Sequence, residues 1–446
     1  MLRDLDIAML IVYALVCIGI GIYGSKKQKA VEYLIAGRKL GKWGFTFSVL
    51  ASYIGGSALV AYSAFVYEFG ISAISLFIGT SVGFLLFIRY AKQIRLLGKE
   101  KEFITLSDWF YHHFGTRAGL LSAIIMLFVY FGLLMNQFIA GSSILSSISG
   151  WSYESSLFLS GTVILIYLIL GGFRSVIKTD IFQYLVLIVL FAVLVFVMMT
   201  EKRTAAIDLF KPGKIDISMT IGFIAYGILS VFYASEYWQR IYAAKNDSVI
   251  RKGFINSAIW IVLTGFVLSM IGLFAKINIP GLEAKEALAY GLSQILPQSL
   301  LGLGLILIFA AIMSSADTMI FVLASSLAKD FFAHFIHKDP DQEYVYRLTK
   351  IFILIISVSS IVAAYFFRDI VAIVMTIAGV GFAIVPPVIA SFHWKIKPVA
   401  AFAALLSGSV YVIVLILTNT LISELAVASV LVSAIVLFVF QKIKRI

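Results

Sequence analysis

The chain has 446 residues, of which 61% are hydrophobic and 13% are charged, and its mean hydropathy is +1.02. A soluble domain carries about 45–50% apolar residues, so little of this chain can face water. The composition therefore indicates an all-α polytopic membrane protein and excludes a soluble globular domain. The single cysteine, Cys17, excludes a disulfide within the chain.

Apolar stretches recur along the whole chain. A helix needs about 20 mainly apolar residues to cross the hydrocarbon core of a bilayer. Thirteen spans of this kind are predicted, at about 7–24, 43–67, 71–91, 119–147, 155–172, 179–200, 218–240, 253–275, 299–328, 350–367, 369–391, 399–418 and 423–441.

The net charge of +12 is divided unevenly between the two sides that these spans predict. When the loops are taken alternately, 27 of the 35 Lys and Arg residues fall on one side and eight on the other. Because basic loops stay in the cytoplasm, we expect the N-terminus outside, the C-terminus inside and the chain in the cell (plasma or inner) membrane. The basic charge therefore reflects topology, and we expect no nucleic-acid partner.

The middle of the second span is rich in glycine and serine. It runs from Ala51 to Ala58 and contains the adjacent residues Gly55 and Gly56. Each glycine weakens a helix by ~1 kcal/mol. An opened helix frees carbonyl groups, which a bilayer tolerates only where they line a cavity or bind a ligand. A helix-packing seam of small residues is the alternative interpretation.

The seventh span has a weaker analogue of this interruption. Tyr226 and Gly227 lie in its middle, followed by polar residues as far as Glu236. Interrupted spans in corresponding places indicate inverted repeats, which would consist of spans two to six and seven to eleven. Since five is an odd number, the second repeat would insert with the opposite orientation.

Polar residues occur at three further points. Asn136 and Gln137 lie at mid-membrane depth in the fourth span, where they either join helices or face the substrate. Residues 171–183 are expected to form a cytoplasmic turn, with Asp180 capping the helix that follows. Residues 236–240 are expected to end the seventh span as a cytoplasmic gate or as a charged group that reaches the interface.

The segment from Ala310 to Thr318 combines hydroxyls and a carboxylate inside the apolar span 299–328. Residues three and four apart share a helix face, so Ser314 is expected beside Asp317 and Thr318. An unpaired charge at this depth costs ~3 kcal/mol or more, and hard oxygen ligands suit a hard cation. A lone Ser often bonds to its own helix instead, but with Asp317 present the cluster favours a cation or polar-substrate site.

Several motifs resemble those of the sodium/solute symporter family and keep the order of that family. Together they extend from about residue 33 to 395, and the run Ser152-Tyr153-Glu154 with the fifth span resembles the bacterial sodium/proline symporter branch most. That branch has an Asp in the first core helix where this chain has Tyr53. The matching segments are Tyr33 to Gly41, Gly171 to Gln183, Gln239 to Lys245, Ala310 to Asp330, and Gly381 to Trp394.

The resemblance implies a leucine-transporter-type fold with a ten-helix core of five plus five helices. Residues 1–42 would form an extra helix and a basic loop, 43–217 the first repeat, 218–397 the second, and 398–446 two peripheral helices. It also implies a secondary active transporter and no enzyme, in which sodium is symported with a small organic solute by alternating access.

The resemblance also implies the residues of the sodium site. The main site of the family takes two carbonyls from the first core helix, and one carbonyl and two hydroxyls from the eighth. These correspond to Ala51, Ile54, Ala311, Ser314 and Ser315, which match in type.

Some members of the family have a second sodium site, which uses the signature Asp and hydroxyls further along the eighth helix. The corresponding residues are Asp180, Ser314 and Thr318. Asp317 stands where a hydroxyl or a small residue is more usual. Three roles are therefore open for Asp317: it joins this second cation site, it carries a proton as the coupling ion, or it points away and pairs with a neighbouring helix.

The expected substrate surface is compact, aromatic and nearly uncharged. Gly55 and Gly56 would let a small carboxylate approach backbone N–H groups, so an amino acid or small organic acid is favoured over a sugar. The residues expected to form the surface are Tyr53, Gly55, Gly56, Ser57, Gln137, Tyr226 and Phe232.

Two further classes of function remain open at this point, namely a passive channel and a membrane-embedded sensor. A channel would not need a closed polar pocket. An intramembrane enzyme would need paired acids or a nucleophile with a base, whereas Asp317 is the only acid expected at mid-membrane depth. The expected partners are a small-molecule solute and the lipid bilayer, and the transporter is expected to work as a monomer.

Overall fold

The computed structural model describes residues 4–25, 29–200, 217–333, 341–367 and 377–443. Within these ranges the regular structure is helical, apart from one isolated bridge between Leu40 and Ala244. In the described part of the chain, nine helices are long and apolar enough to cross a membrane, or ten if one bent pair counts as a single span. The fold is therefore that of an all-helical, multi-pass membrane protein.

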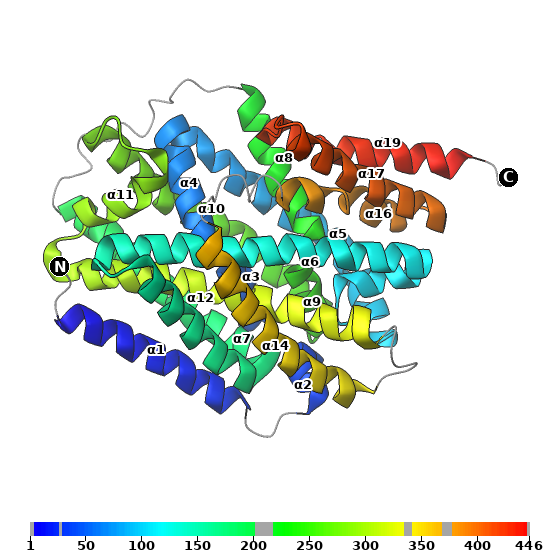
Figure 1. Ribbon diagram of the computed structural model, residues 1–446, viewed down its shortest axis with the longest axis horizontal. Coiled ribbons are helices and arrows are strands. Elements are labelled where there is room, and N and C mark those ends of the chain that lie inside the picture. Colours follow the sequence, from blue (N-terminus) through cyan, green and yellow to red (C-terminus); the bar gives the residue numbers. More distant parts are fainter. Residues whose placement is uncertain (1–3, 26–28, 201–216, 334–340, 368–376, 444–446) are drawn as a thin grey trace.

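Figure 1 shows the helices, coloured in the order in which they follow one another along the chain. The first half consists of α1 (Asp4–Ser25), α2 (Ala30–Ile35), η1 (Ala36–Arg38), α3 (Lys42–Tyr53), α4 (Gly56–Phe69), η2 (Gly70–Ile74), α5 (Ser75–Glu100), α6 (Leu106–Ser149) and α7 (Tyr153–Thr200). The second half consists of α8 (Ile217–Tyr233), α9 (Ser235–Ala243), α10 (Asp247–Asn278), η3 (Ala284–Glu286), α11 (Ala287–Ile295), η4 (Gln298–Leu300), α12 (Leu301–Ser326), η5 (Leu327–Ala333), α14 (Gln342–Phe366), α16 (Val385–Ser391), α17 (Pro398–Leu417), α18 (Ser423–Val427) and α19 (Ser429–Lys442).

Helix α12 lies at the centre of the bundle. Every residue from Gly304 to Ser326 is buried, and α12 packs against α1, α3, α4, α6, α7 and α14. A helix that is apolar on all sides must be covered on all sides, which explains this central position. The Ser and Asp side chains of α12 are therefore enclosed by other helices.

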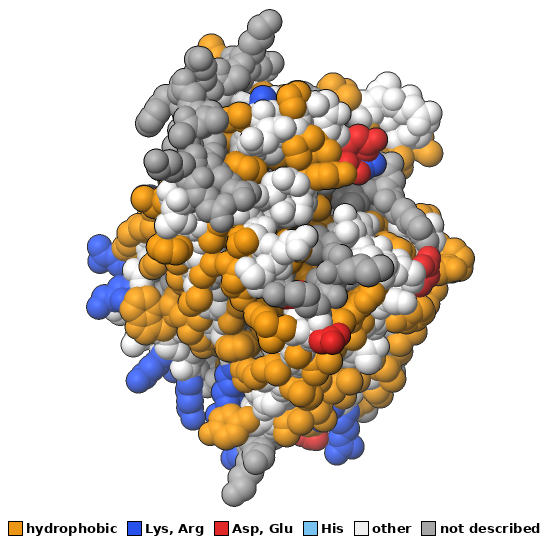
Figure 2. All heavy atoms as spheres, turned by 90° about the vertical axis from the view of Figure 1, so that its left-hand side faces the viewer, with side chains coloured by type: hydrophobic (Ala, Val, Ile, Leu, Met, Phe, Trp, Pro, Cys, Tyr) orange, Lys and Arg blue, Asp and Glu red, His pale blue; other side chains and the backbone are white. Residues whose placement is uncertain are grey.

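Hydrophobic side chains also cover the outside of the protein. Large exposed apolar residues occur along α1, α7, α14, α17 and α19. Figure 2 views the molecule from the left-hand side of Figure 1, the end where α1 begins, and hydrophobic side chains are widespread there as well, with Lys and Arg side chains mainly along the left and lower margins. Such a surface suits the hydrocarbon region of a bilayer.

Fewer long helices are seen than spans expected, partly because some expected spans fall within one continuous helical run. In α7 the backbone of Gly172 is non-helical (φ 56°, ψ −156°), so this one continuous element contains the expected spans 155–172 and 179–200. The apolar run Gly56–Glu100 likewise joins α4 to α5. Part of the expected span 369–391 lies outside the described residues. The count of thirteen crossings therefore stays a prediction.

The expected turn at 171–183 is instead a sharp kink inside α7. Helical structure resumes directly after Gly172, whose ideal Cβ position would lie 2.4 Å from the Tyr33 ring. Only a glycine fits both this contact and the positive φ. As a consequence, Asp180 lies within the helix and does not cap it.

The break in the seventh span lies further along the chain than the sequence predicts. Helix α8 continues through Tyr226 and Gly227 and ends at Tyr233, after which Ala234 is extended and α9 departs at 49°. A Cβ on Gly227 would lie 2.4 Å from the Leu76 carbonyl oxygen of α5. Gly227 therefore allows close packing of two helix backbones, and it does not interrupt α8.

Candidate sodium and substrate site

The second expected span is broken in the middle, between α3 and α4. Helix α3 ends at Tyr53, and Ile54 has a non-helical backbone (φ −90°, ψ 70°). Gly55 is extended and precedes the first residue of α4. The break directs the Ile54 carbonyl out of the regular helical pattern and leaves the last carbonyls of α3 available to other partners.

Two hydroxyls of α12 meet these carbonyls. Ser314 Oγ donates to Ala51 O at 3.0 Å and to Ala311 O at 3.1 Å, and Ser315 Oγ donates to Ser52 O at 3.1 Å and to Ala51 O at 3.4 Å. All of these residues are buried. Four of the five residues expected to bind sodium thus contact one another directly, and the fifth, Ile54, lies at the break itself. Carbonyl and hydroxyl oxygens are the donors that suit a hard cation.

Gly55 brings the start of α4 against α6 and α12. A Cβ on this residue would lie 2.4 Å from Gln137 Nε2 and 2.6 Å from Ser315 Oγ. These distances are too short for any side chain to fit. Close by, the backbone N–H of Ser57 donates to Gln137 Oε1 at 3.1 Å. The structure therefore joins Gly55, Ser57 and Gln137 of the expected substrate surface to the candidate sodium ligands. Gly56 faces Ile312 of α12.

Asn136, the other amide of the Asn136–Gln137 pair, lies in a different environment. Asn136 is fully buried, and neither its Nδ2 nor its Oδ1 atom has a hydrogen-bond partner within the described residues. Gln137 therefore faces the candidate site, whereas the role of Asn136 stays open.

Aromatic rings from four segments lie beside the α3–α4 break. The hydroxyl of Tyr53 bonds to Thr80 Oγ1 at 2.7 Å, and its ring contacts Phe77 with centroids 5.7 Å apart. Tyr226 forms an edge-to-face pair with Phe382 at 5.3 Å. Gly227, next to Tyr226, packs against Thr80, the residue that bonds to the Tyr53 hydroxyl.

The ring of Phe232 takes part in a different cluster. It contacts Phe87 at 5.3 Å and Tyr90 at 6.1 Å. The ring that faces Phe382 together with Tyr226 is that of the next residue, Tyr233, at 5.5 Å. The break at Ala234 rather than at Gly227 changes which residue at the end of α8 points inward. Tyr233 therefore lies with Tyr226 at Phe382, whereas Phe232 of the expected substrate surface lies in a separate aromatic cluster.

A buried guanidinium occupies the region of the expected second cation site. Arg240 Nη2 lies 3.1 Å from Asp180 Oδ2, 2.5 Å from Ser52 Oγ and 3.2 Å from Thr318 Oγ1. Ser48 bridges the pair, since its hydroxyl donates to Asp180 at 2.5 Å and accepts from Arg240 Nε at 2.7 Å. Asp180 and Thr318 therefore already surround a positive charge, which belongs to the chain itself.

Arg240 is thus neither an interfacial nor a snorkelling residue. Its exposure is 0%, and its guanidinium connects α9 with α3, α7 and α12. The expectation of a cytoplasmic gate at 236–240 is compatible with this position, because the pair ties four helices together.

Asp317 faces a different helix from Ser314 and Ser315. Its Oδ2 atom accepts hydrogen bonds from Tyr167 at 2.8 Å and Thr179 at 3.3 Å, both on α7. Its Oδ1 atom is buried and has no hydrogen-bond partner within the described residues. Asp317 therefore lies at the α7–α12 interface, whereas Ser314 and Thr318 bond to α3. Helical spacing alone could not predict that these neighbours on α12 contact different helices.

Sequence reasoning missed Ser48, Ser52, Tyr167, Thr179 and Tyr233. Ser48 and Ser52 are four residues apart on α3, so a polar stripe in an apolar span was a signal available in the sequence. Tyr167 and Thr179 lie on opposite sides of the Gly172 kink, and only the kink brings them to one carboxylate.

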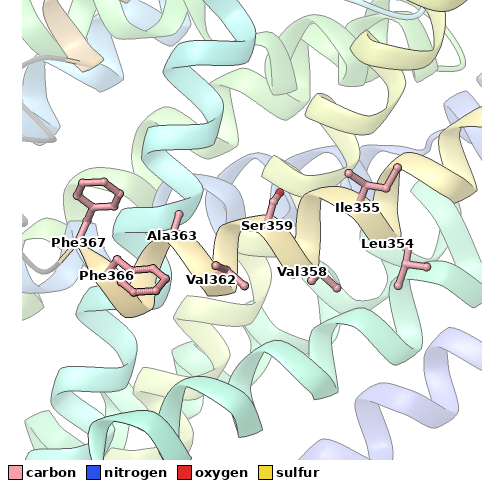
Figure 3. Close-up of a pocket in the computed structure, with 8 residues that line it drawn as sticks. All are labelled: Leu354, Ile355, Val358, Ser359, Val362, Ala363, Phe366 and Phe367. Atoms are coloured by element: carbon pink, nitrogen blue, oxygen red, sulfur yellow. The ribbon is translucent and has the colours of Figure 1, made fainter.

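An apolar groove on the outer face of α14 is separate from this site (Figure 3). Its volume is about 660 Å³, and its lining contains none of the expected site residues. The lining residues are Leu354, Ile355, Val358, Ser359, Val362, Ala363, Phe366 and Phe367.

Comparison with known proteins agrees with these features. The sodium:solute symporter family matches residues 33–408. A sodium/proline symporter of Staphylococcus saprophyticus is 27% identical over 438 residues, which cover 91% of this chain and 85% of that protein. A sodium/proline symporter of Staphylococcus aureus is 27% identical over 440 residues, with the same shares covered.

Solved structures show the same fold. A Na⁺-coupled sialic acid symporter in a substrate-bound, outward-open state matches 99% of this chain and 98% of its own with a TM-score of 0.82, at 18% identity. The nucleobase-cation-symport-1 transporter Mhp1 matches with a TM-score of 0.59 at 14% identity, covering 92% of this chain and 94% of its own. These proteins are transporters, and they include Na⁺-coupled symporters. The chain is therefore a sodium-using membrane transporter and not an enzyme, and it belongs to the sodium:solute symporter family.

Proposed function

We propose that this transporter symports sodium with a small organic solute, an amino acid or a small carboxylate, by alternating access. The observation that carries the proposal is the contact of Ser314 and Ser315 on α12 with the Ala51 and Ser52 carbonyls at the end of α3. A cation bound among these oxygens would join α12 to the broken helix. Sodium binding would thereby change the relative stability of two arrangements of these helices.

The solute is placed beside the same break. Gly55 leaves no room for a side chain between Gln137 and Ser315, so atoms that bind the solute and atoms that bind sodium lie within one small region. The two relatives compared by sequence are sodium/proline symporters, which favours an amino acid over a sugar. A sugar remains the alternative substrate class, and a proton on Asp317 the alternative coupling ion.

We propose thirteen crossings, with the N-terminus outside and the C-terminus in the cytoplasm. The kink at Gly172 supports division of α7 into the separate spans 155–172 and 179–200. The proposed repeats are residues 43–217 and 218–397, and the breaks in the α3–α4 and α8–α9 pairs occupy corresponding places at their beginnings. We also propose that the monomer is the transporting unit.

The direct test is uptake by the purified protein in proteoliposomes. Labelled amino acids, organic acids and sugars are offered with sodium outside and potassium inside, or with potassium on both sides. We expect saturable uptake of one solute class only under the sodium gradient. Uptake that does not saturate would indicate a channel, and solute binding without uptake under any gradient would indicate a sensor.

A further inference from the structure

Glu236 is a carboxylate that neither the sodium contacts nor the Asp180–Arg240 pair uses. It lies in the first turn of α9, directly after the break at Ala234. Ala234 itself is extended (φ −67°, ψ 101°), so the chain presents Glu236 where α8 stops. Acidic residues inside membrane helices are costly and mark ligand or ion sites by default.

The hydrogen bonds of Glu236 do not neutralise its charge. Its carboxylate accepts a hydrogen bond from the Tyr130 hydroxyl of α6. Arg240, one turn further along, reaches only the backbone carbonyl of Glu236, at 3.0 Å, while its other nitrogens bond to Asp180, Ser48, Ser52 and Thr318. Among the residues that the structure describes, no Lys, Arg or His forms a salt bridge with the Glu236 carboxylate.

Tyrosine rings surround this carboxylate. Tyr237 follows Glu236 directly on α9, Tyr233 precedes it by three residues at the end of α8, and Tyr130 bonds to it from α6. The rings of Tyr226 and Tyr233 both meet Phe382 edge-on, with centroids 5.3 and 5.5 Å away. The negative face of an aromatic ring attracts cations, and aromatic cages with a carboxylate recognise substituted ammonium groups.

Part of this cluster faces accessible space. Glu236, Tyr53 and Tyr226 are only partly buried, whereas Tyr130, Tyr233 and Tyr237 are at most 5% exposed. Tyr53 also adjoins Ile54 and Gly55, so the accessible members of the cluster reach the break that carries the candidate sodium ligands.

From this arrangement we propose that the transported solute carries a positively charged ammonium group, which pairs with Glu236 beside the rings of Tyr53, Tyr226 and Tyr233. The inference rests on the proposed function and narrows it to an amine or zwitterion. A carboxylate without an amine would meet like charge at Glu236, and a sugar would leave the charge of Glu236 without a partner. Either case would bury an uncompensated carboxylate when the site closes.

The test compares probes that differ only in the charged nitrogen. The purified full-length transporter in detergent is titrated by thermal shift with L-proline and cyclopentanecarboxylate, and with choline and its uncharged carbon isostere neohexanol. We expect at least one of the two nitrogen-bearing probes to stabilise the protein at millimolar concentration, and its nitrogen-free analogue to bind about 100-fold more weakly. If neither nitrogen-bearing probe binds, or if a nitrogen-free analogue binds as well as its partner, the proposal is wrong.

Substitution of Glu236 gives an independent readout. Glu236→Gln keeps the shape of the side chain and removes its negative charge. We therefore expect the variant to bind the nitrogen-free analogue more tightly than the nitrogen-bearing probe, the reverse of the wild type. Glu283→Gln is the control, because Glu283 is exposed and paired with Lys285 at 2.7 Å. If Glu236 has only a structural role, the substitution would weaken the binding of both probes equally, and this result would refute the assignment. If Glu236→Gln does not fold, the wild-type comparison still decides the question.

Titrations with sodium separate this inference from the proposed function. Sodium chloride is compared with potassium chloride in the wild type and in Glu236→Gln. If sodium stabilises both proteins equally while the ammonium preference is absent, sodium-coupled symport stands and the amine assignment falls. If Glu236→Gln loses the sodium effect, Glu236 belongs to a sodium site and the inference is overturned. If sodium has no effect on the wild type, the proposed function fails first.

Discussion

The guanidinium of Arg240 lies 3.1 Å from the carboxylate of Asp180, and neither side chain is exposed to solvent. The two residues are 60 positions apart and lie on different helices, α7 and α9. Ser48, Ser52 and Thr318 add hydrogen bonds around them from α3 and α12. The pair therefore fixes the mutual positions of four helices beside the candidate sodium site.

Removing one member of this pair should destabilise the protein strongly. Arg240→Met leaves the Asp180 carboxylate buried without a partner, which costs about 3–5 kcal/mol in comparable buried pairs. We expect the double variant Arg240→Met/Asp180→Asn to recover part of this loss, since it leaves no buried charge uncompensated. The free energy of unfolding of both variants is measured in detergent. An equal loss of stability in the single and double variants would contradict an energetic coupling between Arg240 and Asp180.

Loss of either sodium-facing hydroxyl should weaken the sodium dependence of transport. Ser314→Ala and Ser315→Ala each remove one oxygen that contacts the α3 carbonyls, so we expect the sodium concentration for half-maximal uptake to rise several-fold, with little change in expression. Ser360→Ala is a matched control, because that buried hydroxyl bonds to its own helix. Wild-type sodium dependence in both variants would place the cation elsewhere.

Asp317→Asn distinguishes three roles of this carboxylate. If its charge contributes to the cation pathway, sodium affinity should fall at every pH. If Asp317 carries a coupling proton, the pH dependence of uptake should disappear while the sodium dependence is kept. Uptake is measured in sodium and pH titrations, with Tyr167→Phe as a companion variant because Tyr167 donates to Asp317 at 2.8 Å. Wild-type behaviour in both titrations would leave Asp317 with a purely structural role at the α7–α12 interface.

Gly55→Ala should abolish transport. The added methyl group would lie 2.4 Å from Gln137 Nε2 and 2.6 Å from Ser315 Oγ, so both the substrate surface and the sodium contacts must shift. Gly222→Ala in α8 is the control, since its Cβ would meet open space and alanine favours a helix by up to about 1 kcal/mol. Uptake assays on both variants test this contrast. Normal transport by Gly55→Ala would show that the α3–α4 break is not part of the site.

The proposed topology predicts labelling from opposite sides of the membrane. Cysteines introduced as Lys27→Cys and Ser152→Cys should react with a membrane-impermeant maleimide from the inside and the outside, respectively. The native Cys17 is fully buried, so it should give little background. Position 27 lies outside the described residues, and the prediction there rests on the distribution of basic residues. Labelling of both positions from outside would refute the orientation.

Local chemistry in the sequence determined much of this protein. Hydropathy alone requires a membrane protein, because so few residues can face water. The adjacent Gly55 and Gly56 predicted an interrupted helix, and α3 and α4 separate at that point. The resemblance carried by the order of the motifs led to the family and implied a set of sodium ligands, four of which contact one another in the structure.

Other features depended on which distant segments pack together. Gly227 lies against the backbone of α5 and leaves α8 intact, so the break falls at Ala234 and Tyr233 turns inward instead of Phe232. The cation beside Asp180 is Arg240, and Asp317 turns to Tyr167 on α7. Helical periodicity fixes which residues share a face, but the helix that lies opposite that face is decided by the packing of the whole bundle.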